Sequence, residues 1–127
     1  MKGSEDIEAY LMRLDTPFES LGADMWNLHI QEDQNLVVSA AGPVVVFRLK
    51  VMEVPATGRE TFYETLLTLN TTELVHGAFG LETGSVVIVC TLVLENLDFN
   101  EFQATVDDIS LSVGKLYPLL SKFRSAT

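Results

Sequence analysis

The chain has 127 residues, of which 47% are hydrophobic, and a formal net charge of −10. This length fits a single domain over residues 1–127 that can bury a core. The apolar content excludes a disordered chain, because disordered segments are poor in such residues. The acidic balance argues against a nucleic-acid partner, because contacts with phosphates require clustered Lys and Arg side chains.

The sequence predicts neither a membrane span nor a secretion signal. Its longest apolar run, residues 86–94, is too short to cross a bilayer, so no membrane partner is expected. The first ten residues carry acids where a signal peptide has its apolar segment, which predicts a cytoplasmic protein. The single cysteine, Cys90, cannot form an intrachain disulfide, and this fits a reducing compartment.

The first 54 residues predict one helix and three strands. Ser4 is a candidate N-cap, and Pro17 ends the helix at or before Thr16. The helix has one apolar face, made by Ile7, Tyr10, Leu11 and Leu14. Alternation of apolar and polar residues then predicts strands at residues 26–30, 36–41 and 44–54, which suits an antiparallel meander.

A second helix and a hairpin follow. Thr57 and Glu60 have the spacing of a capping box, and Asn70 suits the left-handed conformation that ends a helix. These signals predict a helix that ends near Leu69. Residues 74–81 and 86–94 are then predicted to form two strands, with residues 82–85 as the turn between them.

The last predicted helix begins after Asp98, an N-cap with Glu101 three residues on. Its apolar residues recur in steps of three and four, at Phe99, Phe102, Val106, Ile109, Val113, Leu116, Leu120 and Phe123. Such a stripe is typical of a helix packed along a sheet, and a coiled coil is the alternative. Gly114 and Pro118 weaken this helix and predict one bent helix or two consecutive pieces.

The predicted order is α-β-β-β-α-β-β-α, an α+β fold with an antiparallel sheet packed by helices. Leu69-Asn70, the Gly77-Ala78-Phe79-Gly80-Leu81 segment and the apolar strand after it resemble the YbjN-like family, which has the type III secretion chaperone-like fold. The close pattern covers residues 62–110, and the element order covers the whole chain. The resemblance implies a small non-enzymatic protein that binds a partner polypeptide, typically as a dimer in the chaperone branch. The YbjN-like branch is described as regulatory or sensory.

Few residues suggest chemistry. His76 and Cys90 lie on strands that we pair, but Cys90 stands in an apolar row, where a cysteine is usually inert packing. No spacing of Cys or His suggests a metal site, and no cofactor is expected. Arg48 and Lys50 share one face of a strand and could hold an anion, although solvation of that face is the simpler interpretation.

The strand at residues 86–94 is apolar on both faces. Its outward face carries Val87, Val89, Thr91 and Val93, which is more apolar than the family pattern. An exposed apolar patch usually marks association, whereas a strand covered on both sides needs no partner. We expect this face to be a subunit or peptide interface, which Met25 and Trp26 extend.

The sequence therefore predicts a non-enzymatic protein-binding module that forms a homodimer and holds a polypeptide partner. The alternative is a small-ligand-binding sensory or regulatory domain with an apolar pocket between sheet and helices. No motif supports an enzyme.

Overall fold

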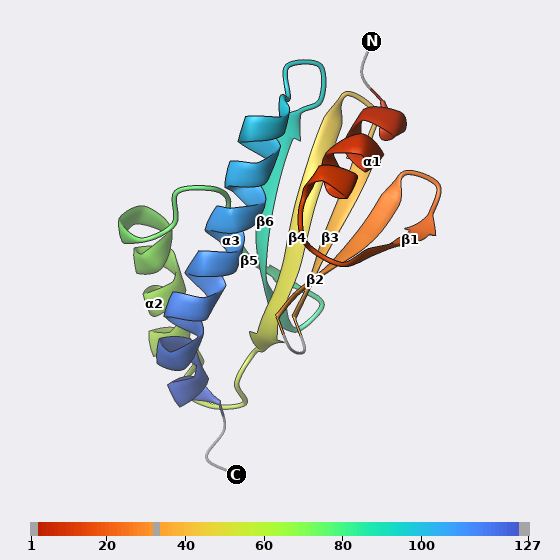
Figure 1. Cartoon of the computed structure of the whole chain (residues 1–127). Helices are drawn as coiled ribbons and strands as arrows, with labels where there is room; N and C mark the ends of the chain where they lie inside the picture. Colours follow the sequence, from red (N-terminus) through yellow and green to blue (C-terminus); the bar gives the residue numbers. More distant parts are fainter. Residues whose placement is uncertain (1–2, 32–33, 125–127) are drawn as a thin grey trace.

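Helices cover one face of an antiparallel sheet in this α+β protein (Figure 1). The computed structural model describes residues 3–31 and 34–124. The elements before the middle helix are α1 (Ser4–Arg13), β1 (Phe18–Gly22), β2 (Met25–Gln31), β3 (Gln34–Ala41) and β4 (Val44–Glu53). They are followed by α2 (Arg59–Thr72), β5 (Ala78–Glu82), β6 (Ser85–Val93), α3 (Phe99–Leu120) and the short 3-10 helix η1 (Ser121–Phe123).

Within residues 3–31 and 34–124, six strands pair in the order β1-β2-β3-β4-β6-β5. Every pairing is antiparallel, and β5 and β1 are the two edges. The predicted element order is present, with β1 as an additional strand. In β1, Phe18 is partly buried and the other four residues are exposed. This edge strand therefore lacks the alternation of apolar and polar residues by which a strand is recognised in a sequence.

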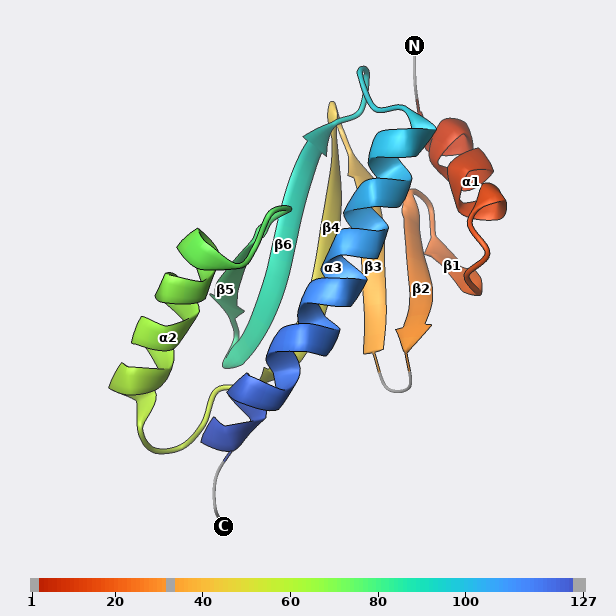
Figure 2. The same cartoon turned by 60° about the vertical axis from the view of Figure 1, so that its left-hand side comes forward.

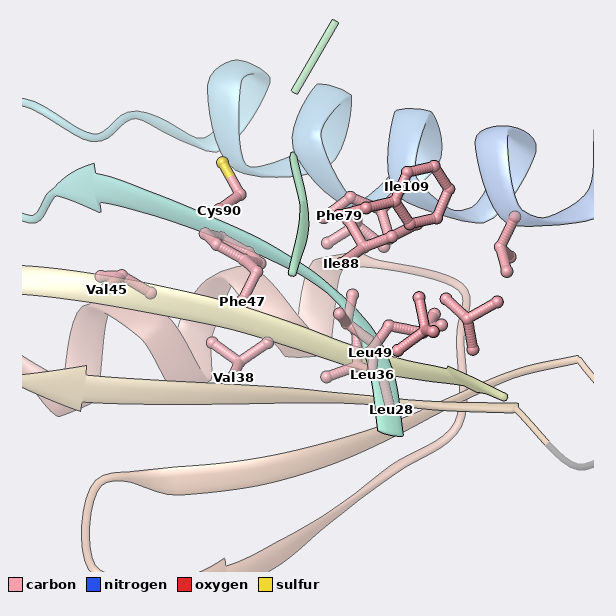
Figure 3. Close-up of a cluster of buried hydrophobic side chains, with 14 of the residues drawn as sticks. Leu28, Leu36, Val38, Val45, Phe47, Leu49, Phe79, Ile88, Cys90 and Ile109 are labelled. Carbon is pink, nitrogen blue, oxygen red and sulfur yellow. The ribbon is translucent and has the colours of Figure 1, made fainter. Parts of the chain in front are cut away.

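The core lies between the sheet and the helices (Figures 1 and 2). Alternate residues of the strands point toward the helices, among them Leu28, Leu36, Val38, Phe47, Leu49 and Ile88 (Figure 3). The predicted stripe on α3 is the surface that packs against them, and the rings of Phe47 and Phe102 lie 5.5 Å apart. The stripe therefore reflects packing along a sheet.

The start of α3 is as predicted, because Asp98 accepts a hydrogen bond from the backbone N–H of Glu101 at 2.7 Å. Of the two alternatives for this element, the structure shows one continuous helix that contains Pro118. Proline removes a backbone donor there, and α3 ends two residues later, at Leu120, where η1 follows.

Two predicted N-caps are wrong. The residue before α1 is Gly3, whose N–H donates to the Asp6 carboxylate at 2.8 Å, so Ser4 is already helical. The residue before α2 is Gly58, and Thr57 precedes it outside the helix. In both places a glycine next to the predicted residue takes the cap position.

The end of α2 was predicted too early, because Asn70 does not terminate it. The helix continues to Thr72, and the Asn70 side chain reaches across to β5. Its Oδ1 accepts from the Phe79 N–H at 2.7 Å, and its Nδ2 donates to the Phe79 carbonyl at 3.4 Å. Asn70 therefore joins the middle helix to the edge strand.

Candidate interaction surface

The face of the sheet opposite the helices is uncovered by any described element, and we call it the open face (Figures 1 and 2). Val87, Val89, Thr91 and Val93 of β6 share it, as predicted from the alternation of the strand. Their exposure rises along the strand, from the buried Val87 to Val93, which is 53% exposed. The second apolar side of this strand is therefore not core beneath a helix.

One end of the open face carries no charged side chain. Strand pairing places Met25, Ser39, Val46 and Thr91 in one row, and Ala41, Val44 and Val93 in the next. We call these seven residues the uncharged end. Met25 and Val93 are its large exposed apolar side chains.

Trp26 does not extend this surface, contrary to expectation. It pairs with Val38 on the side of the sheet that faces the helices, and only 2% of it is exposed. Its indole N–H donates to the Glu8 carboxylate of α1 at 3.3 Å. Because neighbouring strand residues point to opposite faces, only Met25 of the two lies on the open face.

The other end of the open face carries charges around a hollow of about 380 Å³, and we call it the charged end. Its polar side chains are Asn35, Arg48, Lys50, Glu82, Thr83 and Ser85. Arg48 pairs with Glu82 at 3.1 Å between Nε and Oε2. Lys50 pairs with Glu53, and hydrogen bonds from Lys50 and Ser85 hold the pKa of the Glu53 carboxyl below its usual range.

A second candidate surface was missed by the sequence analysis. An apolar groove of about 190 Å³ lies between α2 and the edge strand β5, lined by Tyr63, Leu66, Leu67, Phe79 and Leu81 among others. Leu67 and Leu81 are 67% and 55% exposed. The sequence shows that both residues are apolar, but it does not show that β5 lies at the edge of the sheet, because the order of the strands is a tertiary feature. We call this surface the edge groove.

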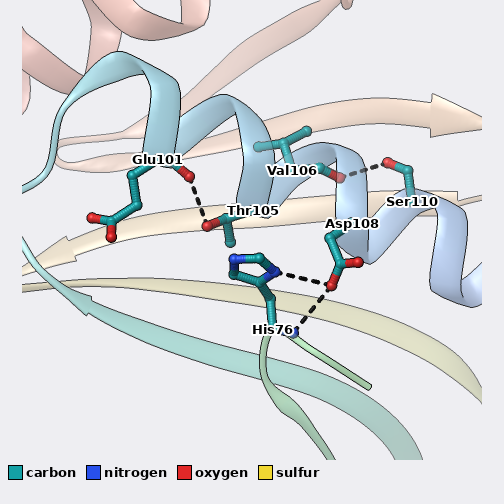
Figure 4. Close-up of polar contacts among 6 residues, drawn as sticks. All are labelled: His76, Glu101, Thr105, Val106, Asp108 and Ser110. Carbon is teal, nitrogen blue, oxygen red and sulfur yellow. Dashed lines mark hydrogen bonds and ion pairs between the residues drawn. The ribbon is translucent and has the colours of Figure 1, made fainter. Parts of the chain in front are cut away.

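His76 and Asp108 form a polar link between α3 and residues 74–77, a segment that we call the strap (Figure 4). The strap was predicted as strand, but β5 begins only at Ala78. The Asp108 carboxylate accepts from the His76 backbone N–H at 3.0 Å and contacts its Nδ1 at 3.1 Å. The Asp108 carboxylate therefore connects the strap to α3.

A family model, CesT_Tir_1, matches residues 1–126 of the chain. The chain belongs to this family of type III secretion chaperones. No curated protein matches the chain by sequence.

The family membership agrees with similarity to solved structures. A chain of the heterodimeric ExoU–SpcU complex from the type III secretion system of Pseudomonas aeruginosa has a TM-score of 0.71 and 19% identity, with 92% of this chain and 98% of that chain covered. YbjN from E. coli, a putative transcription regulator, has a TM-score of 0.70 and 15% identity, with 92% of each chain covered. A chain of the ExsC–ExsE complex has a TM-score of 0.71 and 17% identity over the full length of both chains. The predicted YbjN-like, type III secretion chaperone-like fold is thereby confirmed.

The chain offers little for covalent chemistry in its described part. Burial raises the pKa of the Cys90 thiol, and the negative charges of Asp108 and Glu101 raise it further. In the described part of the chain, Cys90 makes no hydrogen bond to His76. A nucleophilic cysteine requires the thiolate, so this thiol is held in its unreactive form.

Residues 3–31 and 34–124 contain no group of three His, Cys, Asp or Glu side chains that could hold a metal ion. Nor does any helix among them have the length and apolar character needed to cross a membrane.

Proposed function

We propose that the protein is a non-enzymatic, cytoplasmic, polypeptide-binding module that acts as a homodimer. Its family is a chaperone family, which supports a protein-binding role. Among the similar solved structures is a chain of the HopA1–SchA chaperone–effector complex, with a TM-score of 0.65 and 10% identity over 89% of each chain. This similarity concerns the fold, and the surfaces of this chain carry the rest of the proposal.

The observation that carries the homodimer is the uncharged end of the open face. Two copies with a net charge of −10 each repel one another, and the repulsion is least where the facing surfaces lack charge. The uncharged end meets this condition and also exposes Met25 and Val93. A two-fold contact places the same patch on both copies, which suits a patch without charges.

The edge groove is the surface that we assign to the partner polypeptide. The outer side of β5 has no neighbouring strand among the described residues, so its backbone can pair with an added strand. Leu67 and Leu81 beside it provide apolar contacts for the side chains of such a segment. The two surfaces are separate, so a dimer can hold two segments.

Affinity capture from the native cell, followed by mass spectrometry, tests polypeptide binding. A polypeptide retained by the wild-type chain should be lost with Leu81→Asp. Leu111→Asp is the matched control, because Leu111 is also strongly exposed but lies on α3, outside both surfaces. Equal retention by both variants, or capture of nothing by the wild type, would contradict the proposal.

A further inference from the structure

The hollow at the charged end lies outside the surfaces assigned to the dimer and to the polypeptide. We propose that it binds a small oxyanion, a carboxylate or a phosphate, through Arg48 and Lys50. The inference is independent of the polypeptide-binding function, because it uses neither the edge groove nor the uncharged end.

The hollow brings together the groups that oxyanions need. Arg48 and Lys50 stand two residues apart on β4, so both side chains emerge on the open face. Thr83 and Ser85 line the hollow with hydroxyl groups, and Asn35 lines it with an amide. The chain has 8 Lys and Arg against 18 acids, and here two of these cations stand together, Arg48 paired with Glu82 and Lys50 with Glu53.

Among these residues, Arg48 gives the strongest indication of an oxyanion site. Its Nε is buried and makes no hydrogen bond in the part of the chain that the structure describes, although it lies 3.1 Å from a Glu82 oxygen. The contact is an ion pair with poor hydrogen-bond geometry. A guanidinium offers a planar fork of donors that matches two oxygens of a carboxylate or phosphate, and here its Nε makes only the ion pair with Glu82.

Thr83 supports the same site by its backbone. It occupies a two-residue turn with Gly84, between the paired residues Glu82 and Ser85, at a φ of +49°. A β-branched residue is strained in this conformation, and Asn or Gly is the usual choice there. Retained strain of this kind clusters at functional positions, and here it occurs at a residue that lines the hollow.

Glu82 and Glu53 hold the two cations when no ligand is bound. An incoming oxyanion replaces Glu82 at Arg48 and accepts hydrogen bonds from the hydroxyl groups of Thr83 and Ser85. A chloride ion has no separate oxygen atoms, so it cannot accept from Arg48 and from these hydroxyl groups in the same geometry. Binding is therefore selective for oxyanions, reversible and sensitive to salt.

The test is a titration of the full chain with inorganic phosphate and, separately, with succinate, followed by amide NMR at an ionic strength kept constant with sodium chloride. We expect saturable shifts at the amides of Thr83, Ser85 and Val87, and about tenfold weaker binding for Arg48→Ala and for Lys50→Ala. Arg48→Lys keeps the charge without the fork and should also bind more weakly. Lys115→Ala removes an exposed cation on α3 and should bind as the wild type does.

The two probes identify the ligand class. Saturation by phosphate alone assigns a phosphate group, saturation by succinate alone assigns a carboxylate, and saturation by both assigns a general oxyanion site. Shifts that chloride reproduces, or binding by a folded Arg48→Ala variant within twofold of wild type, would overturn the proposal.

A second variant separates function from folding. Thr83→Asn relieves the strained turn, so it should raise the melting temperature while it weakens binding of the same probe. A variant that is more stable and binds the probe with unchanged affinity would remove Thr83 from the site and overturn its part in the proposal.

Discussion

At the residue scale, Gly77 stands where the fold leaves no room for a side chain. It has a φ of +81°, and a Cβ added there would lie 2.5 Å from the Val89 carbonyl oxygen and 3.1 Å from the Cys90 Cβ. Gly77→Ala should therefore lower the free energy of unfolding by more than about 2 kcal/mol, measured by urea denaturation. Gly80→Ala is the control, because nothing lies within 4 Å of its added Cβ, and it should change stability by less than about 1 kcal/mol. Equal effects of the two variants would contradict the close approach of the strap to β6.

Cys90 gives a pH dependence with a definite sign. Its pKa is raised in the folded chain, so the folded state keeps the thiol proton at a pH where the unfolded state has lost it. The free energy of unfolding should then fall as the pH rises above the ordinary range of a thiol, to about pH 9.5. Urea denaturation of the wild type and of Cys90→Ala, at a pH below the ordinary pKa of a thiol and again at about pH 9.5, measures this fall. The fall should be smaller in the variant, and an identical fall would show that other groups cause it.

At the residue scale, the sequence predicted side-chain directions well wherever alternation was regular. Val87, Val89, Thr91 and Val93 share the open face because β6 alternates without interruption. Met25 and Trp26 were placed on one surface although neighbours in a strand point apart. The partner of His76 was not predictable, because Asp108 is 32 residues away and only the fold brings it near.

At the scale of the elements, the contact between α2 and β5 depends on the side chain of Asn70. Asn70→Ala leaves the Phe79 backbone N–H without its 2.7 Å acceptor and should cost about 2 kcal/mol in urea denaturation. Asn70→Asp keeps the acceptor but sets a carboxylate oxygen opposite the Phe79 carbonyl in place of the donor, so it should cost less than Asn70→Ala but more than nothing. The exposed Thr71→Ala should change stability by less than about 0.5 kcal/mol. A cost for Thr71→Ala equal to that for Asn70→Ala would contradict the assigned role.

Elements with strong periodicity were predicted well, and their ends less well. The stripe of α3 and its Asp98 cap were correct, because both signals are local. The end of α2 was not, because Asn70 satisfies a backbone group of another element instead of ending its own helix. The strap was predicted as strand because it continues the apolar pattern, but Gly77, with a φ of +81°, interrupts the extended backbone, and β5 begins only at Ala78.

At the scale of the whole molecule, the α+β fold and its antiparallel sheet followed from the element order, and family membership agrees with them. The layer arrangement explains why one strand is apolar on two sides, because one side meets the core and the other forms the open face. The edge groove could not be predicted, because it depends on β5 being the last strand in the sheet.

Size-exclusion chromatography with light scattering tests the central claim most directly. At micromolar concentration the wild-type chain should have twice the mass of one chain, and Val93→Asp should have the mass of one. Val75→Asp is the matched control, because Val75 is exposed on the strap, away from the open face, and this variant should remain a dimer. A wild-type monomer, or a Val93→Asp variant that stays dimeric while Leu81→Asp becomes monomeric, would contradict a dimer formed through the open face.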